Sequence, residues 1–190
     1  MNPEEAGPAA KVGVTAASAL EELVMQFNAG DVVIHPVYGM GHITAIEEKQ
    51  FSEIEACLYY QIAFPRSNIW VPIEAQEAIG LRLVTAKGDL DKYRDLIKSR
   101  PVLLSGDLPK RHIELASRLK EGSFQTMCEV VRDLTATGWQ KPLGPTTKSI
   151  LRKTQERLYQ EWAMAADVSI AEATKEIGTL LQATQEATLK

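Results

Sequence analysis

The 190-residue sequence is poor in the residues that usually carry catalysis or bind metals. Its two cysteines, Cys57 and Cys128, lie far apart among apolar neighbours, and only three histidines are present. None of these residues has the spacing of a zinc site, and the motifs of nucleotide-binding loops and nucleophilic serines are missing. We therefore expect buried free thiols, and we expect no enzymatic activity, metal or cofactor.

Long apolar runs are also missing. No stretch approaches the ~18 apolar residues of a membrane-spanning helix, and Glu4 and Glu5 stand where a secretory signal would be basic. The hydrophobic fraction of 45% is nevertheless that of a globular protein, and the length allows one large domain or two small ones. We expect a cytoplasmic protein.

Positive charge is in the minority, because 21 Lys and Arg stand against 25 Asp and Glu, for a net charge of −4. This balance excludes a protein that coats nucleic acid without specificity. The segment 101–160, however, contains ten basic and six acidic residues. Such a cluster can neutralise phosphates, and the alternative is a solvated helix face. Basic residues recur at helical spacing in three pairs: Lys148 with Arg152, Lys153 with Arg157, and Arg111 with Arg118.

Short runs with period-2 alternation follow Phe27 and predict an antiparallel β domain. In the last strand, Ile69, Val71 and Ile73 share one face and Trp70 points to the other. In the second, Ile43 and Ile46 fall on opposite faces. Four short strands in sequence predict a small barrel or strongly twisted sheet. The predicted strands are 31–35, 42–51, 56–64 and 69–73, with turns at 38–41 and 65–68.

Helical spacing replaces this alternation after Gly80, and predicts a compact bundle. Ser123 is a natural N-cap, and Ser169 with Glu172 has the spacing of a capping box. The predicted helices follow Asp89 as far as Ser99, then span 110–121, 124–138, 147–166 and 170–182. The sequence thus predicts an α+β protein with a flexible extension (1–26), a β domain (27–75), a helical domain (76–185) and a tail (186–190).

Particular residues then resemble a known family. The run Phe27-Asn28-Ala29-Gly30-Asp31-Val32-Val33-Ile34-His35-Pro36, with Tyr38-Gly39 and Gly41-His42-Ile43 after it, resembles the start of the CarD/CdnL family of bacterial transcription factors. The transcription-repair coupling factor shares this module. The resemblance continues through 70–74, 80–82 and 129–134, and covers about residues 27–182.

The resemblance implies a Tudor-like, SH3-type β barrel that binds the β subunit of bacterial RNA polymerase by adding a strand to a sheet edge. It also implies a helical domain that contacts promoter DNA at the upstream edge of the bubble and stabilises the open complex. We expect a monomeric activator, associated with the nucleoid through the polymerase.

The family's polymerase-contacting side chains correspond to Lys49 and Trp70, and the strand around Trp70 includes Ile69 and Val71. A tryptophan at this position is a departure, because the family often has arginine there. Trp70 is either an interface anchor, a role in which Trp is enriched, or a cover for the outer face of the barrel.

Leu108 falls where the family has a tryptophan that wedges into the minor groove, and Lys110, Arg111 and Lys148 fall at its basic positions. A leucine can insert between base steps, or it can pack under the helix as a loop residue. Trp139 is an alternative contact or a core residue. The leucine keeps a second hypothesis open, an adaptor on the polymerase without DNA contact. The predicted DNA-binding set is Leu108, Lys110, Arg111, Arg118, Lys148 and Arg152.

Overall fold

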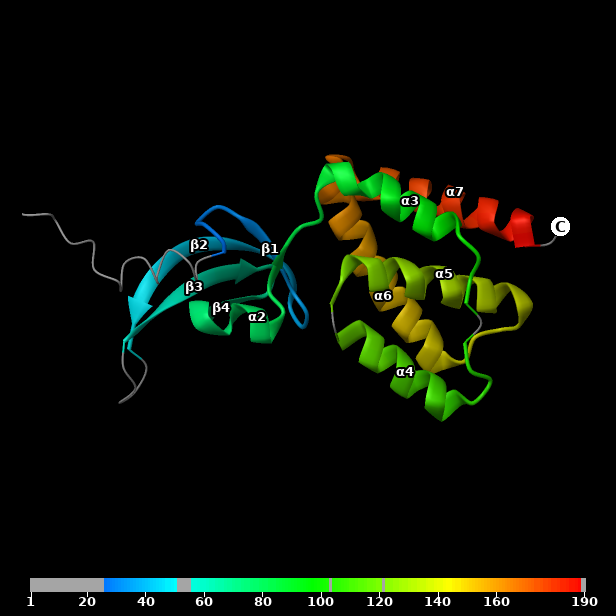
Figure 1. Ribbon diagram of the computed structural model, residues 1–190, viewed down its shortest axis with the longest axis horizontal. Helices are drawn as coiled ribbons and strands as arrows, with labels where there is room; N and C mark the ends of the chain where they lie inside the picture. Colours follow the sequence, from blue (N-terminus) through cyan, green and yellow to red (C-terminus); the bar gives the residue numbers. More distant parts are fainter. Residues whose placement is uncertain (1–25, 51–55, 103, 121, 189–190) are drawn as a thin grey trace, which may run out of the picture.

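The computed structural model describes residues 26–50, 56–102, 104–120 and 122–188. An antiparallel sheet is followed by a bundle of helices, and the two lie side by side along the long axis of the molecule (Figure 1). The predicted α+β architecture, with a Tudor-like β domain before a helical domain, is confirmed. The predicted flexible extension lies, apart from Gln26, outside the described residues. None of the described helices is long and apolar enough to cross a membrane.

The sheet has the strand order β4-β3-β2-β1-β5, and every neighbouring pair is antiparallel. The four predicted strands are present. The fifth was not predicted, because two residues are too few to show an alternation. It extends the sheet beyond residue 75, where the end of the β domain was expected. The strands are β1 (Val32–His35), β2 (Gly39–Lys49), β3 (Cys57–Phe64), β4 (Ser67–Pro72) and β5 (Arg82–Leu83).

Two details of β2 correct the sequence analysis. The strand begins at Gly39, which pairs with His35, so the turn consists of residues 36–38 and the predicted turn at 38–41 is wrong. The pairing with β3 also shifts between Ile43 and Ala45, as in a β-bulge. Because the extra residue reverses the alternation, Ile46 packs on the same core as Ile43, and the prediction of opposite faces is wrong.

Tyr60 ties the core of the sheet to the segments around it. Its hydroxyl donates to Gln76 Oε1 at 2.9 Å and accepts from the backbone N–H of Phe27 at 3.3 Å. Burial raises the pKa of this phenol, which therefore stays a neutral donor. Gln76 begins the short helix α2 (Gln76–Ile79). The core consists of Phe27, Val33, Ile43, Tyr60, Ile62, Phe64, Val71, Ile73 and Leu81.

The predicted helices are present, with shifted ends. The Ser123 hydroxyl accepts from the N–H of Thr126 at 3.0 Å, and Ser169 and Glu172 form the predicted capping box. Gly138 does not end its helix, which continues to Gln140. Trp162 is fully buried in the bundle core. The helices are α3 (Leu90–Lys98), α4 (Leu108–Lys120), α5 (Phe124–Gln140), α6 (Pro145–Ala166) and α7 (Ile170–Thr188).

A buried carboxylate on α6 joins the two domains. Glu161, only 1% exposed, accepts from both Nη atoms of Arg82 at 2.6 and 2.8 Å. It also accepts from the backbone N–H and the hydroxyl of Thr85, at 3.2 and 2.9 Å. Arg82 Nε donates in addition to the Gly122 carbonyl at 3.0 Å. The segment that leaves the sheet is thus held against the helical domain by a charge pair with several hydrogen bonds.

We expect Gly41→Ala to destabilise the β domain. A Cβ atom at Gly41 would lie 2.7 Å from Phe64 Cε1 and 2.9 Å from Ile62 Cγ2, both in the core. Overpacking of this kind costs about 1–3 kcal/mol of unfolding free energy, measurable by urea denaturation. Gly88→Ala is the control, because nothing lies within 4 Å of a Cβ there. Equal stability of the two variants would show that Phe64 moves aside without cost.

We expect Arg82→Ala to lower the free energy of unfolding by about 2 kcal/mol. This is below the roughly 3–5 kcal/mol of a fully buried pair, because the Arg82 side chain is 26% exposed. The matched control is Arg152→Ala, whose ion pair with Glu156 is 70% and 58% exposed on its two sides and should change stability by less than about 0.5 kcal/mol. Losses of the same size in thermal unfolding would contradict this role for Arg82.

Candidate functional site

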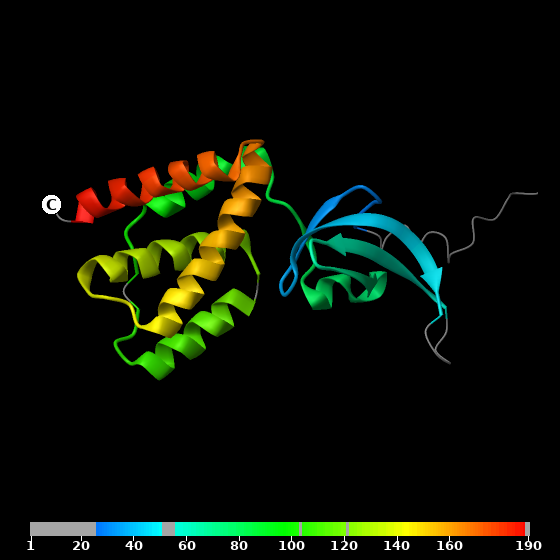
Figure 2. The same cartoon turned by 180° about the vertical axis from the view of Figure 1, so that it is seen from behind.

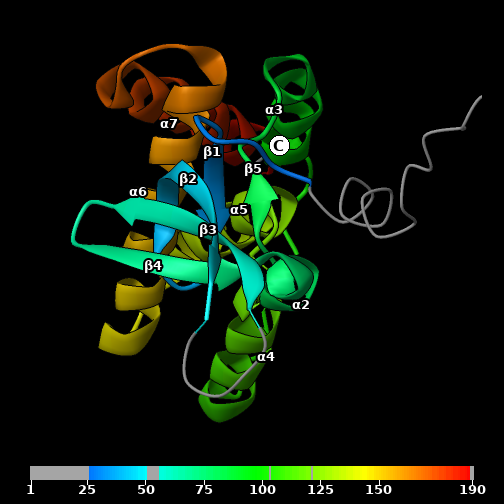
Figure 3. The same ribbon diagram turned by 90° about the vertical axis from the view of Figure 1, so that its left-hand side faces the viewer.

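Strand β4 forms one edge of the sheet. It pairs with β3 from Phe64↔Ser67 to Tyr59↔Pro72, and no described strand lies on its other side. The opposite edge is β5, as Figure 3 shows. An edge strand presents backbone donors and acceptors that another strand can pair with. The β domain thus has a natural site for strand addition at β4.

Lys49 and Trp70 come together beside this edge. The Nζ atom of Lys49 lies 5.0 Å from the centroid of the Trp70 ring, and it also pairs with Glu47 Oε2 at 2.9 Å. Trp70 is 40% exposed. This cation–π contact keeps an aromatic face and a positive charge next to the exposed backbone of β4.

The other predicted polymerase-binding residues, Ile69 and Val71, point the opposite way. Val71 is buried, and Ile69 is half-buried against the same core cluster. Their side chains therefore belong to the core of the sheet, and what they offer to a partner is the backbone of β4.

The starts of α4 and α6 lie together at the end of the molecule remote from the sheet (Figures 1 and 2). His112 Nε2 and Thr147 Oγ1, 3.2 Å apart, join the two helices there. Lys110 and Lys148 are each two residues or fewer from this contact, and both are exposed. Leu108, Lys110, Lys148 and Arg152 are named the basic end from here on.

Leu108 is part of the first turn of α4 and not of the preceding loop. Its side chain is 52% exposed, so the alternative that it packs under the helix is wrong. Arg152 is exposed and pairs with Glu156 Oε1 at 3.3 Å, one turn further along α6. The structure thus places these exposed residues near the starts of α4 and of α6, two helices that are joined there by His112 and Thr147.

The guanidinium groups of Arg111 and Arg118, unlike the exposed side chains of the basic end, are hydrogen-bonded within the protein. Arg111 is 3% exposed, and its Nε and Nη2 atoms both donate to the Ser105 carbonyl, at 2.8 and 2.5 Å. Arg118 donates to Glu129 Oε2 at 2.9 Å and lies 3.7 Å from Asp133 Oδ2. Both arginines therefore hold α4 and the loop before it in place.

The contact with Arg118 also affects the Glu129 carboxylate. Burial alone would raise the pKa of Glu129, but hydrogen bonds from Gln125 and Arg118 lower it below its usual value. Glu129 thus stays ionised as the partner of Arg118. Trp139, the other candidate DNA contact, is half-buried against the core of the bundle.

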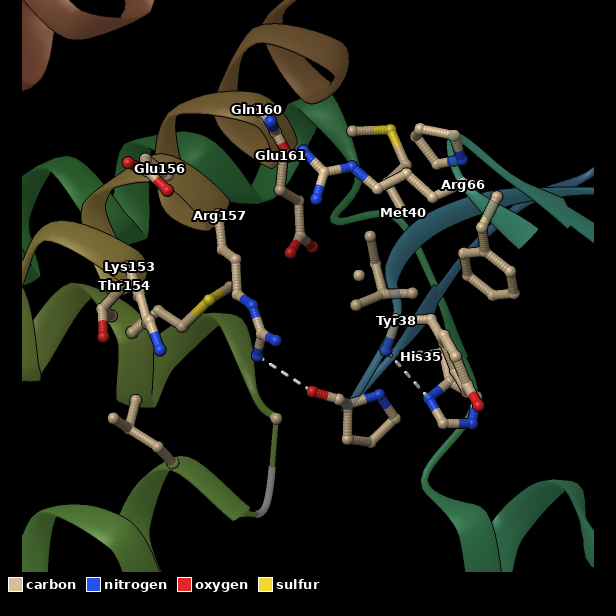
Figure 4. A pocket seen from close by; sticks show the side chains of 18 of the residues that line it. His35, Tyr38, Met40, Arg66, Lys153, Thr154, Glu156, Arg157, Gln160 and Glu161 are labelled. Carbon is tan, nitrogen blue, oxygen red and sulfur yellow. Dashed lines mark hydrogen bonds between the residues drawn. The ribbon is translucent and has the colours of Figure 1, made fainter. Parts of the chain in front are cut away.

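Arg157 was not among the predicted site residues. Its Nη1 atom donates to the carbonyl of Pro36 at 2.9 Å, the contact drawn in Figure 4, and its Nη2 atom donates to the carbonyl of Val37 at 3.0 Å, so α6 contacts the turn after β1. His35 Nδ1 accepts from the N–H of Val37 at 3.0 Å, and burial lowers the pKa of His35, which favours the neutral ring. The turn after β1 is thus held by Arg157 of α6 on one side and by His35 of β1 on the other.

Glu161 and Arg82 were also missed. The one signal for them in the sequence is an acidic residue three positions after Leu158 and directly before Trp162, within the apolar stripe of α6. A charge at such a position needs a buried partner. The sequence does not show which residue that partner is.

Comparison with known proteins agrees with this arrangement. The family model of the CarD-like/TRCF RID domain matches residues 27–84, and that of the CarD C-terminal domain matches residues 93–178. The chain is 31% identical over 137 residues to a protein of Bacillus subtilis (strain 168) named "Putative transcription factor YdeB", a match that covers 71% of this chain and 89% of that protein. The two matched segments coincide with the sheet and the helical bundle, and the chain belongs to the CarD family.

Proposed function

We propose that this chain is a bacterial transcription regulator that binds the β subunit of RNA polymerase and stabilises the promoter open complex. The observation that carries the proposal is the separation of two surfaces, the β4 edge on the sheet and the basic end at the far end of the bundle. The name of the relative, a transcription factor, supports this function. The protein would act in the cytoplasm, at the nucleoid.

The proposed polymerase contact is strand addition at β4. Backbone hydrogen bonds along Ser67–Pro72 would supply affinity, and the side chains that point away from the core would supply specificity. Trp70 has the exposed apolar area of an interface anchor, and Lys49 adds a charge beside it. Ile69 and Val71 would take part through their backbone only.

The proposed DNA contact is the basic end. Lys110 and Lys148 can reach phosphates, and Leu108 can enter the minor groove at a base step that is already partly open. The exposed ion pair of Arg152 with Glu156 contributes little to stability, so Arg152 can exchange its carboxylate partner for a phosphate.

The charge of the whole chain supports weak binding to free DNA. A net charge of −4 opposes DNA binding in general, and only a few basic residues are clustered at the basic end. Attachment to the polymerase would raise the effective concentration of this end next to the promoter. A factor that binds the open complex more tightly than the closed complex shifts their equilibrium by the ratio of the two affinities.

A second candidate function is an adaptor that uses the helical domain to bind a protein. The observation in its favour is exposed apolar surface on α4, where Ile113 is 72% and Leu108 is 52% exposed. The two functions differ in whether the charges of the basic end matter once the polymerase is bound.

We expect Trp70→Ala to weaken binding to the isolated β lobe of RNA polymerase by about tenfold to thirtyfold, the loss of a hot spot of roughly 2 kcal/mol. The matched control is Leu83→Ala, which removes an apolar side chain that is 48% exposed at the opposite edge of the sheet. Thermal unfolding of both variants verifies that they fold. Equal affinities of the two variants in a pull-down titration would place the polymerase contact elsewhere.

We expect Lys110→Glu combined with Lys148→Glu to abolish the lengthening of open-complex lifetime while polymerase binding is retained. Reversal of both charges places carboxylates where phosphates would bind. The double variant Lys87→Glu with Lys175→Glu is the control, because it makes the same change of charge at exposed positions outside the basic end. Full activity of the first variant, measured with a competitor challenge, would favour the adaptor.

A further inference from the structure

The two domains enclose a cleft of about 1020 Å³ that the proposed contacts do not use. Its walls are the turn after β1, the turn between β3 and β4, and the middle of α6, as Figure 4 shows. Tyr38, Met40 and Phe64 supply apolar surface, and the Tyr38 side chain is 49% exposed. The cleft is therefore an open groove with one aromatic side chain in reach of a ligand.

Three cationic side chains line this cleft: Arg66, Lys153 and Arg157. Arg66 comes from the sheet and the other two from α6. None of the three forms an ion pair within the described part of the chain. Arg157 donates to two backbone carbonyls, which are neutral and leave its charge uncompensated.

The carboxylates of the cleft do not cancel this charge. Glu161 is neutralised by Arg82 at 2.6 Å. Glu156 pairs with Arg152 at 3.3 Å, but this exposed contact is one that Arg152 can exchange for a phosphate, so Glu156 offsets one of the three cations. His35 also lines the cleft, and burial lowers its pKa, which favours the neutral form. With Glu161 neutralised and Glu156 counted as one negative charge against the three cations, the cleft keeps an excess of positive charge. Low-dielectric walls of a groove concentrate such a field and attract anions.

Helix α6 connects this charge to the basic end. Lys148 and Arg157 are nine positions apart on α6, a rise of about 14 Å at 1.5 Å per residue, and Arg152 and Lys153 lie between them. That length corresponds to about four base pairs of duplex DNA at 3.4 Å each. At about 100° per residue, Lys148 and Arg152 face a different side of α6 from Lys153 and Arg157, so a polyanion bound at the basic end would reach the cleft by crossing the exposed face of this helix.

We propose that the cleft is a second DNA-binding site, which takes the phosphate backbone of promoter DNA on Arg66 and Lys153. The proposal rests on the proposed function, because DNA reaches the cleft only when the polymerase holds the chain at a promoter. DNA fits these observations better than an acidic protein segment does, because two of the three cations of the cleft, Lys153 and Arg157, lie on the same helix as the basic end, within about 14 Å of Lys148 along its axis. An exposed aromatic ring also lies beside them, as in grooves that bind single-stranded nucleic acid.

The test is Arg66→Ala combined with Lys153→Ala, in complexes of the full chain with polymerase and promoter DNA. Both side chains are exposed and carry no described ion pair, so folding should be retained, whereas Arg157 is left intact because it supports a turn. We expect the gain in open-complex lifetime to fall about fivefold and the slope of log affinity for the promoter complex against log salt to decrease by roughly 1 to 2. The control is Lys87→Ala with Lys175→Ala, which also removes two exposed charges.

Behaviour equal to the control would overturn the proposal. A loss of affinity for polymerase in the absence of DNA would also overturn it, because the cleft would then bind protein. The variant Lys110→Glu with Lys148→Glu separates the two proposals. If that variant is inactive while the cleft variant matches its control, the cleft site is wrong and the proposed function stands. If both variants match their controls, both proposals are wrong.

Discussion

The arrangement of the molecule depends on one buried carboxylate, that of Glu161. A charge that is 1% exposed is tolerated only when it is paired and hydrogen-bonded, and its donors are Arg82 of strand β5 and Thr85 of the segment that follows it. Separation of the domains would leave this charge without partners. The pair therefore couples the position of the sheet to α6, and α6 also carries Lys148 at its start and Arg157 near the turn after β1.

The main features of the fold could be predicted from the sequence because they are local. Alternation along β3 and β4 and the caps at Ser123 and Ser169 depend on neighbouring residues, and the structure confirms them. The features that the sequence did not predict depend on contacts between distant parts of the chain. Two residues of β5 become a strand only because β1 is there to pair with them, and a bulge in β2 places Ile46 beside Ile43. Gly41 pairs with Val33 within the strand, and the reason for a glycine there is that Phe64 and Ile62 leave no room for a side chain.

Side-chain roles could be predicted only in part. Spacing indicated that Arg111 and Arg118 share a face of α4, but not that this face meets Ser105 and Glu129. Lys110, one position before Arg111, points to solvent. A rotation of about 100° per residue thus separates an available cation from a structural one. The partners of Glu161 are far away in the sequence, at positions 82 and 85, and no local pattern connects them.

The coupling of the domains matters for a factor that, as proposed, would bind polymerase and DNA through two separate surfaces of low affinity. A second contact gains from the first only when the connection between them holds the two surfaces at the right separation, and a flexible connection lowers the effective concentration. In this protein the connection is helix α6, which the Glu161–Arg82 pair holds against the sheet. The position of the basic end relative to the sheet is therefore already fixed when the protein folds, and less conformational entropy is lost on binding. Under the proposed function, an acidic chain would thus use a few cations on DNA without affinity for DNA in general. Its specificity would then come from the protein partner that positions it.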